Sequence, residues 1–445
     1  MDICLLNPTN SLKGEAMNKD LAGGLGTLSD FGGSFTSKIL SFIKKKSVIL
    51  PIISFAYIQA ILKKKGHNVA YVEGDNITKK YDLILVYGSI VDFKNEVDIC
   101  KKIKHNFPST KIGFFGSFPS IRPDLFNEFD FVIIGEAESF FLYEFKSMNQ
   151  IKKITNVKKI LNLDDLPSPD FDNFPIDKYS YFPAIKEKPF LVLQMSKGCP
   201  YSCAYYCPYG SIQGKQYRKR SAENIFADIL KLIKRYKAKG IQFRDPTFGI
   251  DKAEITKFCN LIIDNKIKIK FGIETRIDLL DKEIISLMFR AGLRNINVGV
   301  ETINEGVAII NKRKLIEIKK QEEIIRYCDK IGVKISAFYI IGLFGDSIDS
   351  IKKTIDYAIK LNTNTAQFVI SCPYPGTKYY DYLKSKDLII EEEFEKFNSA
   401  NLVFKHDKLI PKELLKLREY SFKRYYFRWG YILNFLKWRI REFWL

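Results

Sequence analysis

Apolar residues along the first third of the chain follow two alternating patterns. Short apolar runs suited to buried strands are separated by segments in which apolar residues recur at helical spacing. The predicted strands are 3–6, 68–72, 83–87, 112–115 and 131–134, and the clearest helix is 52–65. Strands that alternate with helices predict an α/β fold with a doubly wound parallel sheet.

Turns of small residues follow several of these strands. Ligands of such sheets bind in the loops at the carboxyl ends of the strands. The candidate binding residues at these ends are Gly88, Ser89, Gly116, Ser117 and Glu136, the last of them within Gly135-Glu136-Ala137-Glu138. An ordinary turn is the alternative interpretation of each glycine. A glycine-rich segment after the first strand, with Gly23-Gly24, is a candidate for closing over a ligand.

The pattern breaks over residues 151–188, which are rich in Pro, Asp and Lys, and a second alternation follows. Its predicted strands are 191–194, 241–243, 270–273, 296–300, 334–341 and 365–370, and its helices are 222–237, 252–265, 282–291, 316–331 and 350–360. Strand and helix units in series predict a full or partial parallel βα barrel with its reactive groups at the strand carboxyl ends. We therefore predict a first domain at 1–150, a linker at 151–188, a barrel at 189–400 and a helical tail at 401–445.

Three cysteines, Cys199, Cys203 and Cys207, lie in the loop after the first barrel strand. Closely spaced thiolates can hold three corners of a 4Fe-4S cluster and leave the fourth iron for a small-molecule ligand. A structural zinc loop and three unrelated thiols are the alternatives. Zinc normally takes four protein ligands, and none of the three histidines, His67, His105 and His406, is an evident fourth.

The motifs of the chain, taken in order, resemble those of radical S-adenosylmethionine proteins with an amino-terminal cobalamin-binding, Rossmann-like domain. The resemblance runs from residue 5 to about residue 405. Its pieces are Gly135-Glu136-Ala137-Glu138, the cysteine loop, Phe243-Arg244-Asp245-Pro246-Thr247-Phe248, Glu274-Thr275-Arg276-Ile277-Asp278, Gly299-Val300-Glu301-Thr302, Ile341-Gly342-Leu343-Phe344-Gly345-Asp346 and Pro373-Tyr374-Pro375-Gly376-Thr377. It implies a 4Fe-4S cluster, S-adenosylmethionine and cobalamin as cofactors.

The resemblance also implies roles for residues at the barrel mouth. Asp245 and Glu301 can accept hydrogen bonds from an ammonium group or a ribose, and Arg276 can hold a carboxylate through its planar fork. Gly342 allows the backbone to approach an adenine or sugar. Tyr206, the aromatic residue before the last cysteine, is the expected neighbour of the adenine. An ion pair at the barrel mouth is the alternative for each charged residue.

Two features depart from the family pattern. The family spaces its cysteines by three residues and then two, whereas three residues separate Cys203 from Cys207. A short insertion can be absorbed by a local bulge of the loop. The histidine of the Asp-x-His-x-x-Gly pattern, which supplies a cobalt ligand in many cobalamin domains, has no counterpart.

The implied reaction is reductive cleavage of S-adenosylmethionine to a 5′-deoxyadenosyl radical, followed by methylation of an unactivated carbon through cobalamin. Radical coupling, cyclisation or rearrangement without cobalamin is one alternative, and a non-catalytic electron carrier or sensor is another. The implied partners are a small-molecule or lipid substrate and a reducing donor such as flavodoxin or ferredoxin. No catalytic residue is assigned.

Composition and charge add limits to this picture. The net charge of +20 permits an anionic partner, but solvated lysine-rich faces explain it as well, and nucleic acid is not favoured. Eight cysteines in 445 residues, and a start unlike a signal peptide, favour the cytoplasm.

In the tail, apolar residues recur at helical spacing: Trp429, Ile432, Leu433, Leu436, Ile440 and Phe443. The helix predicted in 420–445 either contacts the inner face of a membrane or packs on the barrel.

Overall fold

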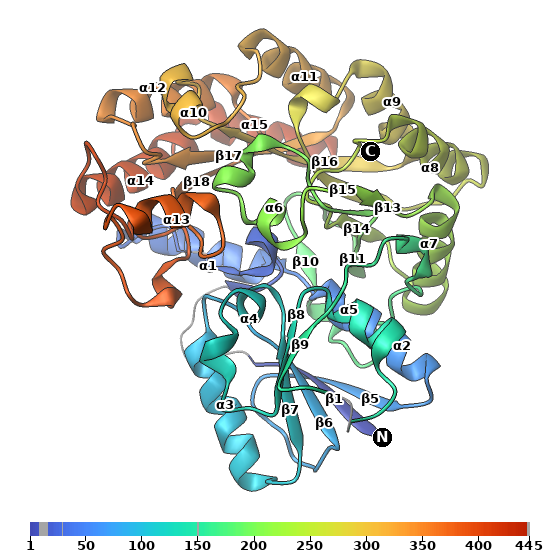
Figure 1. Ribbon diagram of the computed structural model, residues 1–445. Helices are drawn as coiled ribbons and strands as arrows, with labels where there is room; N and C mark the ends of the chain where they lie inside the picture. The colour runs from blue at the N-terminus through green and yellow to red at the C-terminus, as the bar shows by residue number, and fades with distance from the viewer. Residues whose placement is uncertain (9–16, 29, 149–150, 443–445) are drawn as a thin grey trace.

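Two parallel sheets with their helices make up the molecule. The computed structural model describes residues 1–8, 17–28, 30–148 and 151–442. Figure 1 shows the smaller α/β unit, which contains the N-terminus, below the larger one. The α/β class, the two parallel sheets and the helical carboxyl-terminal region confirm the predicted fold.

The first sheet has six parallel strands in the order β5-β1-β6-β7-β8-β9. They are β1 (Asp2–Asn7), β5 (Asn68–Glu73), β6 (Leu83–Tyr87), β7 (Lys111–Phe115), β8 (Phe131–Ile134) and β9 (Ile154–Asn156). All five residues of β6 are buried, as expected for a strand covered on both faces. Because β9 belongs to this sheet, the first unit extends beyond residue 150.

Helices cover both faces of the first sheet. They are α2 (Ile53–Lys64), α3 (Phe93–Asn106), α4 (Ser117–Ile121) and α5 (Ala137–Ser139). The predicted helix at 52–65 corresponds to α2, whereas α3 was not predicted. Eight of the twelve residues of α2 are buried, because this helix lies between the two units of the molecule.

The second sheet is a partial barrel with the strand order β11-β14-β15-β16-β17-β18. Its strands are β11 (Phe190–Leu193), β14 (Gly240–Phe243), β15 (Lys270–Thr275), β16 (Leu293–Glu301), β17 (Lys334–Ile341) and β18 (Thr365–Ile370). Among the described strands, the edges β11 and β18 do not pair with each other. The barrel is therefore open on one side, and all its carboxyl ends share one mouth.

The barrel helices begin and end where the sequence supplies caps. They are α6 (Pro208–Ile212), α7 (Ala222–Tyr236), α8 (Lys252–Asp264), α9 (Lys282–Ala291), α10 (Glu305–Ile310), α11 (Ile318–Ile331), α12 (Ile348–Leu361) and α13 (Lys378–Ser385). The side chains of Ser221, Asp251 and Asp281 accept backbone hydrogen bonds at the starts of α7, α8 and α9. Gly292 ends α9 in a left-handed conformation.

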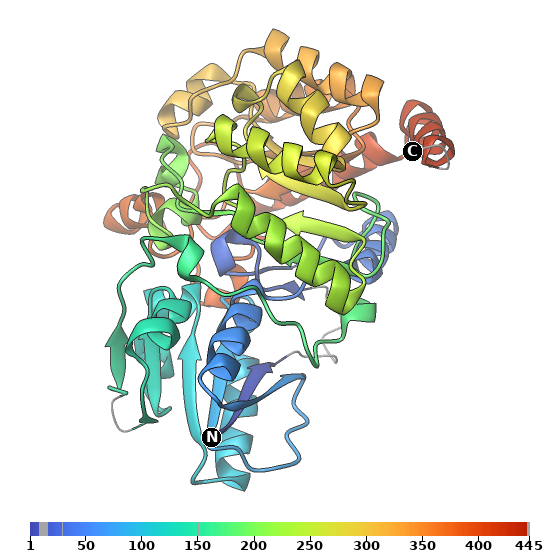
Figure 2. The same ribbon diagram turned by 90° about the vertical axis from the view of Figure 1, so that its right-hand side faces the viewer.

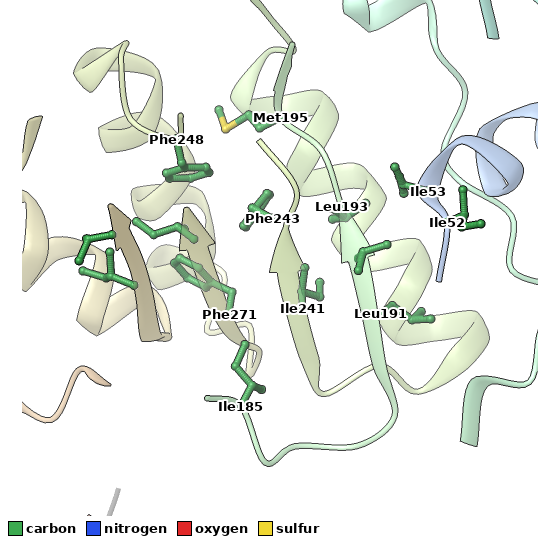
Figure 3. Packing of buried hydrophobic residues seen from close by; sticks show 14 of the residues in the cluster. Ile52, Ile53, Ile185, Leu191, Leu193, Met195, Ile241, Phe243, Phe248 and Phe271 are labelled. Atoms are coloured by element: carbon green, nitrogen blue, oxygen red, sulfur yellow. The ribbon is translucent and has the colours of Figure 1, made fainter. Parts of the chain in front are cut away.

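A continuous apolar core joins the two units. Figure 3 shows Leu191 and Leu193 of β11 beside Ile241 and Phe243 of β14, and Ile52 and Ile53 near β11 from the other unit. All six are at most 4% exposed. Burial at this junction stabilises the relative placement of the two sheets by the hydrophobic effect.

Short elements between the sheets and at the end of the chain complete the fold. The segment at 151–188 contains β9 and β10 (Ser180–Tyr181), and β10 pairs with β4 (Val48–Ile49). The other elements are β2 (Met17–Asn18), β3 (Thr27–Leu28), β12 (Ser196–Lys197), β13 (Arg218–Lys219), α1 (Phe35–Ser47), α14 (Pro411–Tyr426) and α15 (Trp429–Arg441). No helix among the described residues is long and apolar enough to cross a membrane.

Candidate functional site

The cysteine loop begins and ends at two short paired strands, β12 and β13. β12 and β13 pair antiparallel, with Lys197 opposite Arg218. All three cysteines lie in the sequence between these strands. The ends of the loop are therefore fixed by backbone hydrogen bonds, and two cations stand side by side at its root.

Two carboxylates of the first unit pair with these cations. Arg218 donates hydrogen bonds to both carboxylate oxygens of Glu136, at 2.5 and 3.0 Å. Lys197 lies 3.3 Å from Glu138. All four residues are buried. We call Glu136, Glu138, Lys197 and Arg218 the interdomain clamp, because they attach the loop after β8 to the root of the cysteine loop.

Electrostatics within the clamp favour the ionised form of Glu136. Burial acts to raise the pKa of this carboxyl, but Lys197 and Arg218 outweigh burial and hold the pKa below its usual value. The backbone amide of Ile160 also donates to Glu136 at 3.0 Å. A buried carboxylate with this many donors is a charged structural anchor.

Asp245 holds the root of the loop from the barrel side. Its carboxylate accepts a hydrogen bond from the Met195 amide at 2.9 Å and one from the Ser196 hydroxyl at 2.6 Å. Asp245 is 1% exposed, and burial raises its pKa to about 7. Asp245 therefore positions β12 in this structure, and its contact with a ligand stays a prediction.

The three cysteines gather at the barrel mouth with little exposure. Cys199 is buried, with its Sγ 3.4 Å from the Thr247 hydroxyl. Burial is the main cause that raises the pKa values of Cys203 and Cys207, and the neighbouring cysteines add to it. Buried thiols with raised pKa values become thiolates most readily when a cationic group binds them.

The donor set consists of three thiols, which are the ligand type of iron–sulfur clusters. No group of three His, Cys, Asp or Glu side chains in the described part of the chain converges on one metal ion. Each thiolate of a 4Fe-4S cluster binds a different iron, so the sulfurs surround the cluster without converging on a point. Cys199, Cys203 and Cys207 match that ligand set in residue type.

A helical turn absorbs the additional residue between Cys203 and Cys207. The chain forms a 3₁₀ turn over Ser202–Tyr205, and the amide of Cys207 donates to the carbonyl of Cys203 at 2.9 Å. The longer spacing is therefore taken up by a turn that a backbone hydrogen bond between the two cysteines closes.

Tyr206, the predicted neighbour of an adenine, points toward the mouth of the barrel. Its hydroxyl accepts a hydrogen bond from Arg313 at 3.1 Å. The same guanidinium lies 3.8 Å from the Glu301 carboxylate. The sequence thus identified Tyr206 and Glu301 but missed Arg313, which lies outside the motifs and joins them.

Glu301 has a backbone conformation unusual for its residue type. Its φ of 68° lies in the left-handed region, and the pairing of β16 with β17 shifts register between Gly299 and Glu301. A Cβ on Gly299 would lie 2.2 Å from the carboxylate of Glu301, so a side chain there would have to displace that carboxylate. Bulges and strained residues commonly aim side chains at functional sites. Burial raises the pKa of Glu301, and Arg313 and Arg276 oppose that rise.

Two other predicted mouth residues have partners within the protein. Arg276 donates to both oxygens of Asp278, at 2.9 and 2.7 Å, and stacks over Tyr201. Gly342 has a φ of 71°, and a Cβ there would meet Leu414 of α14 at 2.6 Å. The close approach at Gly342 is therefore to a helix of this chain.

The predicted residues of the first sheet divide into two groups. Gly88 packs against Pro119, and Ser89 donates its hydroxyl to Glu96 at 2.6 Å beneath the surface. Gly116, Ser117 and Glu136 instead line a cleft between the two sheets. Of the five predicted residues, these three are the ones that face the cleft.

The cleft holds about 650 Å³ of space that protein atoms do not fill, part of which is open to solvent. It lies where the carboxyl ends of the first sheet face the mouth of the barrel. Its walls come from both units and include Asp20, Gly23, Gly24, Ser54, Tyr87, Gly116, Ser117, Ser120, Gly135, Glu136, Glu138, Gln194, Lys197, Tyr209, Gln213 and Arg244. Most of these residues are small or polar, and Ile53, Phe115, Ala137 and Ile212 add apolar wall.

The glycine-rich segment forms one wall of the cleft. Tyr87 donates its hydroxyl to the carbonyl of Gly24 at 2.8 Å, and Ser117 donates to Gly23 at 2.6 Å. On the other side, Arg244 donates to the Asp20 carboxylate at 3.0 Å and also contacts Glu274. The segment therefore bridges the two units, in agreement with a role in closing the cleft.

The histidines of the chain lie away from the cleft. His406 is buried, with Nε2 2.9 Å from the carbonyl of Leu343. His67 makes an edge contact with Phe145, and His105 lies in the last turn of α3. None of them is a wall residue of the cleft.

Comparison with known proteins agrees with this geometry. Residues 193–358 match the family model of the radical SAM superfamily. The chain is 23% identical over 414 residues to an uncharacterized methyltransferase of Pyrococcus horikoshii, covering 85% of this chain and 88% of that protein. It is 23% identical over 357 residues to the bacteriochlorophyllide d C-8(2)-methyltransferase of Chlorobaculum tepidum, covering 78% and 76%.

A solved structure shares the fold over most of the chain. The radical S-adenosylmethionine methyltransferase TsrM of Kitasatospora setae, determined with cobalamin and a [4Fe-4S] cluster bound, superposes with a TM-score of 0.63. The match covers 86% of this chain and 75% of that chain at 11% identity. At this identity the likeness is one of fold.

The clamp should dominate the stability of the junction. Glu136→Gln leaves the Arg218 guanidinium buried without a charged partner, which costs about 3–5 kcal/mol when one member of a buried pair is lost. Urea unfolding should show that loss. The surface substitution Glu223→Gln, which breaks an exposed contact with Lys257, is the control and should leave unfolding unchanged. Equal stability of both variants would contradict the clamp.

The three loop cysteines should all be required for a cluster. Anaerobic reconstitution should give about four irons per chain in the wild type. Cys199→Ala, Cys203→Ala and Cys207→Ala should each lose most of that iron and the visible absorbance. Cys259→Ala, at a buried cysteine of α8, should retain both. Normal absorbance in Cys207→Ala would remove that residue from the ligand set.

Asp245 should make stability depend on pH. Its pKa is about 7 in the folded protein and 3.8 ordinarily, so the folded state binds the extra proton between these values. The stabilisation that this raised pKa gives to the folded state is full below about pH 4 and is lost as the pH rises through 7. The stability of the wild type relative to Asp245→Asn should therefore fall from pH 5.5 to pH 8 in urea unfolding. A difference independent of pH would contradict the raised pKa.

Proposed function

Since residues 193–358 match the family model of the radical SAM superfamily, we propose that the chain methylates an unactivated carbon of a small molecule with cobalamin as the methyl carrier. The observation that carries the proposal is the cleft between the two sheets. It has the cysteine loop on one side and the carboxyl ends of a doubly wound sheet on the other. Those are the two places where such sheets bind cofactors.

The first step assigned to this site is reductive cleavage of S-adenosylmethionine. When bound, a 4Fe-4S cluster on Cys199, Cys203 and Cys207 would supply the electron that breaks a carbon–sulfur bond and gives methionine and a 5′-deoxyadenosyl radical. Glu301 accepts hydrogen bonds from the ammonium group or ribose, and Arg313 holds Glu301 and Tyr206 in place. The predicted adenine contact of Tyr206 fits its position at the mouth.

The carboxylate of S-adenosylmethionine has a candidate partner in Arg276. Its guanidinium already meets Asp278, but the charge of Arg276 also acts on Glu301 and on Cys203. Arg276 is therefore near Glu301 and Cys203, the two groups that the proposal places around S-adenosylmethionine. Its planar fork can bind a carboxylate in two hydrogen bonds.

The opposite wall of the cleft is the place assigned to cobalamin. Bound there, it would supply the methyl group for the substrate carbon. Gly116, Gly135 and Gly24 leave the wall without side chains, and Ser54, Ser117 and Ser120 offer hydroxyls. The wall has no histidine for the cobalt, so we propose that this chain binds cobalamin without a histidine ligand. TsrM, which shares the fold, was determined with cobalamin bound.

The proposal also includes the substrate and the other partners of the reaction. A small-molecule substrate would lie in the cleft between the two cofactors, where the clamp and the Asp20–Arg244 contact exclude water. The related methyltransferase of Chlorobaculum tepidum acts on a bacteriochlorophyllide. A lipid substrate, a flavodoxin or ferredoxin as donor, a cytoplasmic location and a membrane contact of residues 420–445 stay predictions.

Formation of 5′-deoxyadenosine tests the first step. Reconstituted protein with S-adenosylmethionine and a strong reductant should release it. Glu301→Gln should raise the KM for S-adenosylmethionine about tenfold or more, because a hydrogen bond to a charged group contributes about 1.5–3 kcal/mol. Glu305→Gln, at an exposed position four residues on, should leave KM unchanged. An intact cluster without 5′-deoxyadenosine would indicate an electron carrier or sensor.

Retention of cobalamin through desalting tests the second step. The wild type should retain about one cobalamin per chain, in line with a single cobalamin cleft. Ser117→Leu, which fills the cleft from the first sheet, should retain much less. A protein that forms 5′-deoxyadenosine but retains no cobalamin would instead catalyse coupling, cyclisation or rearrangement.

A further inference from the structure

Two helices of the chain expose apolar side chains. Of the 23 large apolar side chains that are exposed in the described residues, nine lie on α1 and α15. They are Phe35, Ile39, Phe42 and Ile43 on α1 and Trp429, Ile432, Leu433, Leu436 and Ile440 on α15. We call these nine residues the α1–α15 surface. The reaction proposed above uses none of them.

The helix α1 exposes its apolar face to solvent and buries its polar face. Phe35 is 78% exposed and Phe42 is 58% exposed, whereas Ser37 is 2% exposed. On the inward side, the hydroxyl of Ser41 accepts a hydrogen bond from the Phe31 amide, and Lys44 donates to Gln367 of β18 at 3.2 Å. A helix usually buries its apolar face. The protein instead turns that face of α1 outward.

The helix α15 repeats this arrangement at the other end of the chain. It docks on the barrel through Trp438, which donates to Asp329 at 3.0 Å, and Tyr431, which donates to the carbonyl of Asn364 at 3.0 Å. Trp429 is 79% exposed, and Leu433 is 63% exposed. The helix thus packs on the barrel as one alternative predicted, but its apolar stripe stays exposed. The other alternative, a membrane contact of the tail, stays a prediction. Phe443 lies outside the described residues.

The two stripes have matching spacing and lie on one side of the molecule. Counted from the first residue of each helix, the stripe of α1 occupies positions 0, 4, 7 and 8, which are Phe35, Ile39, Phe42 and Ile43. The stripe of α15 includes positions 0, 4 and 7, which are Trp429, Leu433 and Leu436. Figure 2 shows both helices at the right-hand edge of the molecule. The helix α14 contacts both of them. The stripes therefore belong to one surface.

Exposed lysines accompany the apolar residues. Lys38 and Lys46 lie in the stripe of α1, Lys437 lies in that of α15, and α14 between them exposes Lys416 and Lys423. Apolar and aromatic side chains among lysines are the composition of helices that lie in the interface of an anionic bilayer. A symmetric dimer through this surface would bring the same lysines together across the interface, which is unfavourable.

We propose that the α1–α15 surface docks the protein on an anionic lipid bilayer. Both helices would lie along the bilayer, with their apolar side chains at the boundary between headgroups and acyl chains. The charge of +20 attracts the protein to such a surface, and the apolar side chains hold it there. This surface extends well beyond the tail, because α1 lies near the other end of the sequence.

Vesicle sedimentation tests the proposal. The full chain should bind vesicles of 30% phosphatidylglycerol in phosphatidylcholine and bind poorly to phosphatidylcholine alone. Phe35→Ser/Phe42→Ser and Trp429→Ser/Leu433→Ser should each lower the partition coefficient at least tenfold, because each loses two large apolar groups. Leu161→Ser/Ile309→Ser is the matched control, with side chains 72% and 67% exposed elsewhere, and should bind like the wild type.

Two results would overturn the proposal. One is wild-type binding no stronger to anionic than to neutral vesicles. The other is a dimer in sedimentation equilibrium that the surface variants convert to a monomer, without vesicle binding by the wild type. Circular dichroism and unfolding confirm that each variant is folded. Protein without a cluster should bind vesicles equally, so this test is independent of the proposed reaction.

Discussion

The pairing of Glu136 with Arg218 and of Glu138 with Lys197 sets the geometry on which the site depends. Both carboxylates follow one strand of the first sheet, and both cations stand at the root of the cysteine loop. Four buried charges are stable only when each is paired. The two units therefore meet in one orientation, in which the carboxyl ends of one sheet face those of the other.

The remaining contacts of the site refine that orientation. Asp245 fixes the same root from the barrel side, and Arg244 draws the Asp20 segment across the cleft. Glu301 reaches the mouth through a bulge and a left-handed backbone, where Arg313 holds it. The protein thus uses rigid, buried polar contacts to surround a space in which a reactive radical would be kept from water.

Sequence reasoning predicted the elements well because their signals are local. Strands such as β6, β8, β17 and β18 and the helix α9 were placed at their observed bounds, since apolar runs and capping residues mark them directly. The helix α1 was missed, because its outward apolar face and inward serines do not follow the usual pattern. The short pieces within 151–188 were also missed, because their pairing partners lie far away in the sequence.

The candidate site was predicted in part for a similar reason. Motifs after strands located the cysteines, Tyr206, Glu301 and the turns at Gly116 and Glu136. They did not reveal which of these residues would find partners inside the protein, as Asp245, Ser89 and Gly342 do. Arg313, Arg218 and Lys197 carry no motif signal of their own. Their importance follows from contacts over distances of 12 to 82 residues in the chain.

The central claim is that the two sheets hold an iron–sulfur cluster and a cobalamin across a single cleft. Anomalous difference density at the iron and cobalt edges, from crystals of the reconstituted protein, tests it most directly. The account predicts iron beside Cys199, Cys203 and Cys207, and cobalt between Ser117 and Tyr209. Iron away from the three cysteines, or cobalt absent from the cleft, would contradict it.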